Sequence, residues 1–195
     1  MQPKDIDFLF EAGSLRHVPR AWQQVLGMPV ENVLEHTLRM MLTALTIARG
    51  EGNVDEEKIM KMVLLHDLAE SRTTDIAFIH REYVERHEEK AKHDLLAGTS
   101  FEKDLTLLEE YALRQSLESK VVKDADHLEV DIELKELIKA GSTTASKWQE
   151  QRKVLRDTKL YTETAKKMWD TLQETDSDHW QMNLTNDWIT SPKLK

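Results

Sequence analysis

The sequence predicts an all-α fold with a metal site in its core. The first observation is the scarcity of helix breakers, since the 195 residues include only six glycines and four prolines. Residues 53–97, 99–140 and 142–191 contain neither, whereas strands and hairpins need turn residues more often. The second is apolar spacing with the helical period, and the third is a set of His and Asp residues on those apolar faces.

Composition narrows the class of protein. Hydrophobic residues make up 39% and charged residues 32%, as in a globular chain of one domain. The net charge of −9 argues against nucleic acid or a membrane surface as a partner. The lack of cysteine excludes disulfides, thiolate zinc sites and cysteine nucleophiles. No apolar run reaches the roughly 18 residues that span a bilayer, and no signal segment is evident, so we expect a cytoplasmic protein.

The order of the elements follows from the breakers. Three prolines and two glycines fall within the first 29 residues, so 13–30 is predicted to be an irregular loop. No shift in composition marks a boundary, which predicts a single domain over 1–195 with a core at about 5–140 and a helical extension at 141–195. Helices are predicted at about 4–12, 31–49, 55–70, 77–96, 101–117, 118–140, 144–174 and 177–190.

Two helices carry apolar stripes. Spacing of four and three residues predicts that one stripe of 31–49 and one of 118–140 face a core. The members of the first stripe are Leu34, Leu38, Met41, Leu45 and Ala48. The members of the second are Val121, Ala125, Leu128 and Ile132. The Trp residues of the later helices are expected to serve packing or an interface.

Four polar residues interrupt apolar faces, on three predicted helices. His36 has Val33, Met40, Ala44 and Ile47 at helical spacing, and His66 shares a face with Ile59, Met62 and Val63. Asp67 has Met60, Val63 and Leu64 behind it, and Asp126 has Val122, Val130 and Leu134. All four side chains are therefore predicted to point inward.

A shared cation would explain these four residues. One buried His is usually a satisfied core residue, but an unpaired buried carboxylate costs several kcal/mol and needs a cation or dense hydrogen bonding. Two imidazoles and two carboxylates suit a divalent metal such as Mn, Fe, Co, Ni or Zn.

The motifs around these residues resemble the HD-domain metal-dependent phosphohydrolases. The order His36, then His66 and Asp67, then Asp126 is similar to the H…HD…D signature of that family. The contexts VENVLEH, LLHDLAESRTTDI and VKDADHLE resemble the 5′-deoxyribonucleotidase-like branch, whose members remove phosphate from nucleoside 5′-monophosphates. The segment VPRAW at 18–22 is similar as well. The resemblance covers about 5–140 and implies an HD-domain helical bundle.

The resemblance also implies roles for individual residues. His36, His66, Asp67 and Asp126 would hold one divalent cation, such as Co or Mn. Glu70 would orient or activate water, and Asp75 would be a second acid near the substrate. Arg20 would bind phosphate and Trp22 would shape the sugar or base pocket. Where the family often has Gly and Pro around Asp75, this chain has Thr74 and Ala77, which predicts a reshaped loop beside the substrate.

The expected function is hydrolysis of (deoxy)ribonucleoside 5′-monophosphates to nucleoside and phosphate. Water held by Glu70 or Asp75 would attack a metal-bound phosphate that Arg20 clamps. The alternatives are an HD phosphohydrolase acting on a dNTP or a cyclic nucleotide, and a non-catalytic nucleotide-binding module. Apolar residues on two helix faces, together with the family, predict a homodimer.

Overall fold

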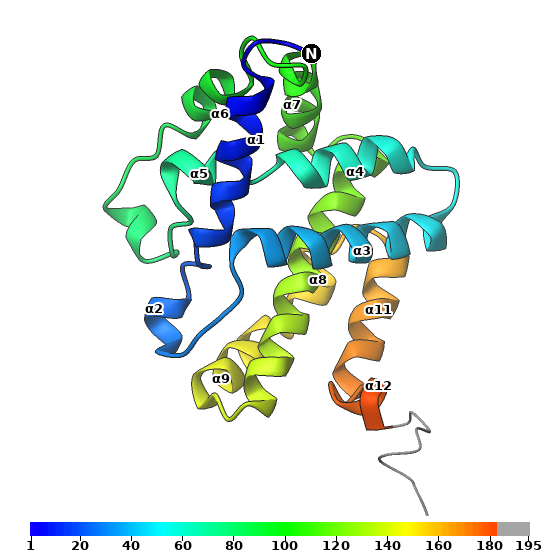
Figure 1. The fold of residues 1–195 in the computed structure, drawn as a ribbon. Helices are drawn as coiled ribbons and strands as arrows, with labels where there is room; N and C mark the ends of the chain where they lie inside the picture. Colours follow the sequence, from blue (N-terminus) through cyan, green and yellow to red (C-terminus); the bar gives the residue numbers. More distant parts are fainter. Residues whose placement is uncertain (183–195) are drawn as a thin grey trace, which may run out of the picture.

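A computed structural model describes residues 1–182 as helices joined by turns (Figure 1). Within that range no β-strand occurs, and a single isolated bridge pairs Pro19 with Asn32. The all-α prediction is confirmed. The longer helices are α1 (Asp5–Gly13), α3 (Val33–Glu51), α4 (Glu56–Leu65), α6 (Glu88–Leu96), α7 (Leu105–Leu113), α8 (Leu117–Lys139), α9 (Thr143–Arg152) and α11 (Glu163–Glu174). The short ones are η1 (Ser14–His17), α2 (Gln23–Leu26), α5 (Glu70–Thr73), η2 (His80–Glu82), η3 (Glu102–Asp104), α10 (Leu155–Thr158) and α12 (His179–Met182).

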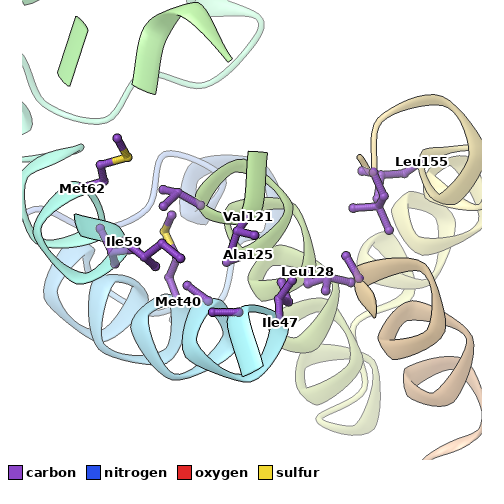
Figure 2. Close-up of a cluster of buried hydrophobic side chains, with 14 residues drawn as sticks. Met40, Ile47, Ile59, Met62, Val121, Ala125, Leu128 and Leu155 are labelled. Atoms are coloured by element: carbon purple, nitrogen blue, oxygen red, sulfur yellow. The ribbon is translucent and has the colours of Figure 1, made fainter. Parts of the chain in front are cut away.

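The centre of the molecule is the crossing of α3, α4 and α8, each of which contacts the other two (Figure 1). Their facing side chains form the main apolar cluster, which Figure 2 shows around Met40, Ile59 and Ala125. Leu155 and Ala165 add to this cluster from the C-terminal helices. A fully buried Ile or Met contributes about 1.5–3 kcal/mol to folding, so this crossing holds the fold together.

The inward face of α3 is the one that carries His36. Its buried members include Val33, His36, Met40, Ala44 and Ile47. The prediction that the Leu34 stripe faces the core is wrong for its first members, because Leu34 is 37% exposed and Leu38 is 63% exposed. Both stripes have helical spacing, so the period alone could not rank them. In 118–140, by contrast, Val121, Ala125 and Leu128 are buried as predicted.

Several predicted helices are shorter than expected. The 55–70 helix ends at Leu65, and of 77–96 only η2 and α6 are helical. The 101–117 helix splits into η3 and α7, and 144–174 splits into α9, α10 and α11. The predicted loop at 13–30 contains η1 and α2. The last predicted helix begins as α12, and its remainder lies outside the described residues.

The C-terminal helices pack on the central crossing. The α9 helix lies along α8, while α11 contacts both α8 and α3. A small apolar cluster joins α8 and α9 to the segment around α2, through Leu134, Ala145, Trp22 and Trp148. Among the described residues, none of the helices is long and apolar enough to cross a bilayer.

Candidate active site

The central crossing brings together the four side chains predicted to share a cation. His36 comes from α3, His66 and Asp67 follow α4 directly, and Asp126 lies in α8. The two imidazole rings are 5.7 Å apart between centroids. Nε2 of His36 lies 3.7 Å from Oδ2 of Asp67 and 3.6 Å from Oδ1 of Asp126, and Nε2 of His66 lies 3.0 Å from the same Asp67 oxygen.

Hydrogen bonds on the far side of each ring aim the Nε2 atoms at this point. Nδ1 of His36 is 2.6 Å from Oε2 of Glu129, and Nδ1 of His66 is 2.7 Å from the carbonyl oxygen of Val63. These acceptors favour a proton on Nδ1, which leaves the Nε2 lone pair free. Both Nε2 atoms are buried and have no hydrogen-bond partner. Such orphaned acceptors need a cation or a donor between them.

The donor set fits a divalent metal. Ligand atoms of His36, His66 and Asp67 all lie within 4.8 Å of one another, which a single ion could span. Asp126 lies at the edge of this group, because its Oδ2 accepts a hydrogen bond from Lys123 at 2.6 Å and only Oδ1 approaches His36. Nitrogen and oxygen donors in this ratio suit Mn, Fe, Co, Ni or Zn.

Behind His36 lies a charged network that was not predicted from the sequence. Nε of Arg39 donates to Glu129 at 2.7 Å, and its two Nη atoms donate to three further carboxylates. Those carboxylates belong to Glu31, Glu133 and Glu136. The signal was present, since three of the acids recur at i, i+4 and i+7 on one face of α8. Their common partner lies about 90 positions away and could not be identified locally.

The acids near the cluster differ in ionisation. Burial would raise the pKa of Asp67, but His66, His36 and Arg20 together lower it to about 2, so this carboxylate stays ionised. Burial, followed by repulsion from Asp67 and Asp75, raises the pKa of Glu70 to about 9. Oε2 of Glu70 is buried without a partner, and Oε1 lies 3.5 Å from Arg86. Glu70 is thus placed to hold or release a proton beside the cluster.

Arg20 and Asp75 lie beside the same cluster. Nη1 of Arg20 is 3.5 Å from Oδ2 of both Asp67 and Asp75. Asp75 is anchored as well by the backbone N–H of Ala21, which donates to the same oxygen at 3.0 Å. Trp22 lies next to this pair, with the Arg20 guanidinium 5.8 Å from its ring centroid. The structure therefore brings all eight predicted site residues into one region.

A cavity of about 370 Å³ opens onto the cluster. Its wall includes His66, Asp67, Glu70, Asp75 and Asp126 together with six cationic side chains. Those cations are Arg20, Arg81, Arg86, Lys92, Arg114 and Lys123, of which only Arg20 was predicted from the sequence. Phosphate-ester hydrolysis uses this combination, in which acidic side chains can bind a metal and cationic side chains can bind the phosphate anion.

The comparison with protein families decides the assignment. The sequence model of the HD domain family matches residues 12–178. The chain belongs to the HD domain family. It is a metal-dependent phosphohydrolase, as its resemblance to that family implied. The match extends past residue 140, the limit of the resemblance recognised from the motifs, and so includes α9 and α11.

Relatives of this HD protein include enzymes named for nucleotide hydrolysis. The 5′-deoxynucleotidase HDDC2 of Danio rerio is 35% identical over 138 residues, which are 67% of this chain and 68% of that protein. The human protein of the same name is 32% identical over 138 residues, 67% of each chain. Among solved structures, a conserved hypothetical protein from Pyrococcus furiosus has a TM-score of 0.71 at 25% identity, covering 88% of this chain and all of that one.

Proposed function

We propose that this HD protein hydrolyses nucleoside 5′-monophosphates, deoxyribonucleotides among them, to nucleoside and phosphate. The observation that carries the proposal is the pair of orphaned Nε2 atoms beside Asp67 and Asp126, next to a cation-lined cavity whose wall includes His66 and both aspartates. His36, His66, Asp67 and Asp126 would hold one divalent metal. The names of the relatives support a nucleoside monophosphate as the substrate.

The bound metal would lower the pKa of a water molecule and neutralise phosphate charge. Three residues of the chain have the remaining roles in binding and proton transfer. Arg20 binds the phosphate oxygens, because it is the cation nearest to Asp67 and its fork of N–H groups matches them. Asp75 is held by Arg20 and the Ala21 N–H, so it positions the substrate. A cation bound beside Glu70 would favour its ionised form. Its unpartnered carboxyl oxygen would then accept the proton of the attacking water.

The test is phosphate release from a panel of compounds in the presence of Mn²⁺ or Co²⁺. Deoxy- and ribonucleoside 5′-monophosphates are compared with dNTPs and cyclic dinucleotides. We expect turnover of monophosphates, its loss in Asp67→Asn, and a fall in kcat of about 10²–10⁴-fold in Glu70→Gln. Asp157→Asn is the matched control, since this aspartate is 74% exposed and lies outside the cavity.

The alternatives give different results in the same panel. Preferred turnover of dNTPs or cyclic dinucleotides would assign the other substrate classes. If metal-loaded protein hydrolyses none of the panel, the nucleotidase proposal is wrong. Nucleotide binding without turnover by metal-loaded protein would indicate a binding module.

We further propose that the chain forms a homodimer through the outer face of α3. Leu34, Leu38 and Leu42 follow one another at four-residue spacing there and are 37%, 63% and 61% exposed. An apolar row of this kind on a helix indicates a protein contact. Sedimentation of the native chain tests the proposal. We expect a dimer that Leu38→Glu converts to a folded monomer, and a monomeric native chain would contradict it.

A further inference from the structure

A second cavity, of about 320 Å³, adjoins the metal cavity. The two share Arg20, Asp75 and Arg81 in their walls. Beyond this shared wall the two linings differ. None of the four predicted metal ligands lines the second cavity, whereas aromatic rings do line it. Three rings line it, those of Trp22, Phe78 and Trp148.

The three rings form a corner around Trp148. Its ring stacks on that of Trp22 at 6.2 Å between centroids, with 19° between the planes, and meets Phe78 edge-on at 6.5 Å. Phe78 is nevertheless 71% exposed, so an apolar ring surface stays open at the mouth of the cavity. Exposed aromatic surface beside a concave site is typical of a ligand contact.

The α8 helix sets the separation between the two cavities. Asp126 lines the metal cavity, while Val130 and Leu134 line the aromatic one. At 1.5 Å per residue, Val130 and Leu134 lie about 6 Å and about 12 Å beyond Asp126 along the same helix face. One small molecule could therefore place a phosphate at the cluster and a flat apolar group in the aromatic cavity, with a short linker between them.

We infer that the aromatic cavity binds the nucleobase of the substrate and that Trp148 is a specificity-determining residue. The inference rests on the proposed function, since phosphate beside Arg20 would leave the sugar at the shared wall and the base against Trp148 and Phe78. It assigns a role to α9, which supplies Trp148 from the extension that the motifs did not explain. The Trp148 ring, expected from sequence to serve packing, therefore also recognises ligand.

The experiment compares a nucleotide with its base-free counterpart. Kinetics with Mn²⁺ are measured for deoxyadenosine 5′-monophosphate and deoxyribose 5-phosphate in Trp148→Ala, Trp148→Phe and the native chain. Loss of stacking predicts a KM about 10-fold higher for the nucleotide in Trp148→Ala, with kcat and the base-free substrate unchanged. Trp148→Phe should recover most of the loss. Trp180→Ala is the matched control, because Trp180 is 71% exposed and lines neither cavity.

A second measurement does not depend on catalysis. Calorimetric titration of deoxyadenosine into metal-free protein should show binding that Trp148→Ala weakens by a similar factor. If Trp148→Ala does not fold, Phe78→Ala replaces it with Phe10→Ala as control, since Phe78 and Phe10 are 71% and 78% exposed.

The possible failures are distinguishable. Equal effects on both substrates, or no effect on either, would overturn the inference and leave the proposed function intact. Hydrolysis of neither substrate by the native chain would overturn the proposed function instead, and the nucleoside titration would still decide whether the aromatic cavity binds a base.

Discussion

At the scale of single residues, the ligand geometry depends on a carboxylate that touches no substrate. Glu129 lies 2.6 Å from Nδ1 of His36 and is itself held by Arg39. We expect Glu129→Gln to weaken Mn²⁺ or Co²⁺ binding about 10–100-fold in calorimetric titration, because it removes the charge that orients the imidazole and makes it basic. Glu136→Gln removes another partner of Arg39 at an exposed position and should change the affinity little. Equal affinities for Glu129→Gln and the native chain would contradict the role of this carboxylate.

Glu70 makes the stability of the metal-free protein depend on pH. Its pKa is about 9 in the folded chain against 4.5 ordinarily, so the folded state holds a proton that the unfolded state releases between these values. Stability must therefore fall as pH rises through this window. Glu70→Gln fixes the neutral form, and we expect it to stabilise the protein by on the order of 1–3 kcal/mol at about pH 8.5 and little at about pH 5.

The measurement is urea unfolding in EDTA at both pH values. Glu57→Gln serves as the control, because this side chain is 73% exposed. Parallel stability curves for Glu70→Gln and the native chain would show that burial does not hold the proton on Glu70.

Thr74 occupies a backbone conformation that suits glycine. Its φ of 56° and ψ of 161° follow α5 directly and set the position of Asp75. A β-branched residue there costs of order 1–3 kcal/mol, whereas glycine loses only about 0.5–1 kcal/mol through chain entropy. Thr74→Gly should therefore raise the unfolding free energy by about 1 kcal/mol, or the Tm by about 2–4 °C. Thr74→Ala keeps a Cβ and should not raise the unfolding free energy. If the Thr74→Gly protein is no more stable than Thr74→Ala, backbone strain at this position is excluded.

At the scale of helices, the motif before His36 has a local cause that sequence could reveal. Asn32 accepts from the N–H groups of Leu34 and Glu35, and the Glu35 carboxylate accepts from the N–H of Asn32. This capping box starts α3 one turn before His36. The similarity of the motif before His36 to the family therefore reflects this capping box, which fixes where the first imidazole lies.

The helix breaks that were not predicted have causes distant in sequence. Residues 159–162 interrupt the expected 144–174 helix where buried Asp124 accepts from the N–H groups of Tyr161 and Thr162 and from the Thr162 hydroxyl. In the expected 77–96 helix, Arg86 lies in the irregular segment 84–87 and donates to the carbonyl of Thr74. Neither contact has a local sequence signature, and absence of Gly and Pro permits a helix without requiring one.

At the scale of the whole molecule, the site exists only because α3, α4 and α8 cross. The α3 and α8 helices each present a His or Asp, and His66 and Asp67 directly follow α4, all of which sequence could identify. Which cavity each face would line, and how the aromatic corner of Trp22 and Trp148 would close beside it, depend on packing between segments more than a hundred residues apart. The chemistry of the site was therefore predictable, and its extent was not.

A cation shared by three helices should stabilise the entire fold. A metal that binds the folded chain and not the unfolded one adds about 4 kcal/mol at a free concentration 1,000 times its Kd. We expect EDTA to lower the Tm of the native protein by several degrees and re-addition of Mn²⁺ to restore it. Asp67→Asn removes a ligand, so its Tm should respond to neither addition, whereas Asp157→Asn should behave as the native chain does. A native Tm that is indifferent to both EDTA and added metal would mean that these helices share no cation.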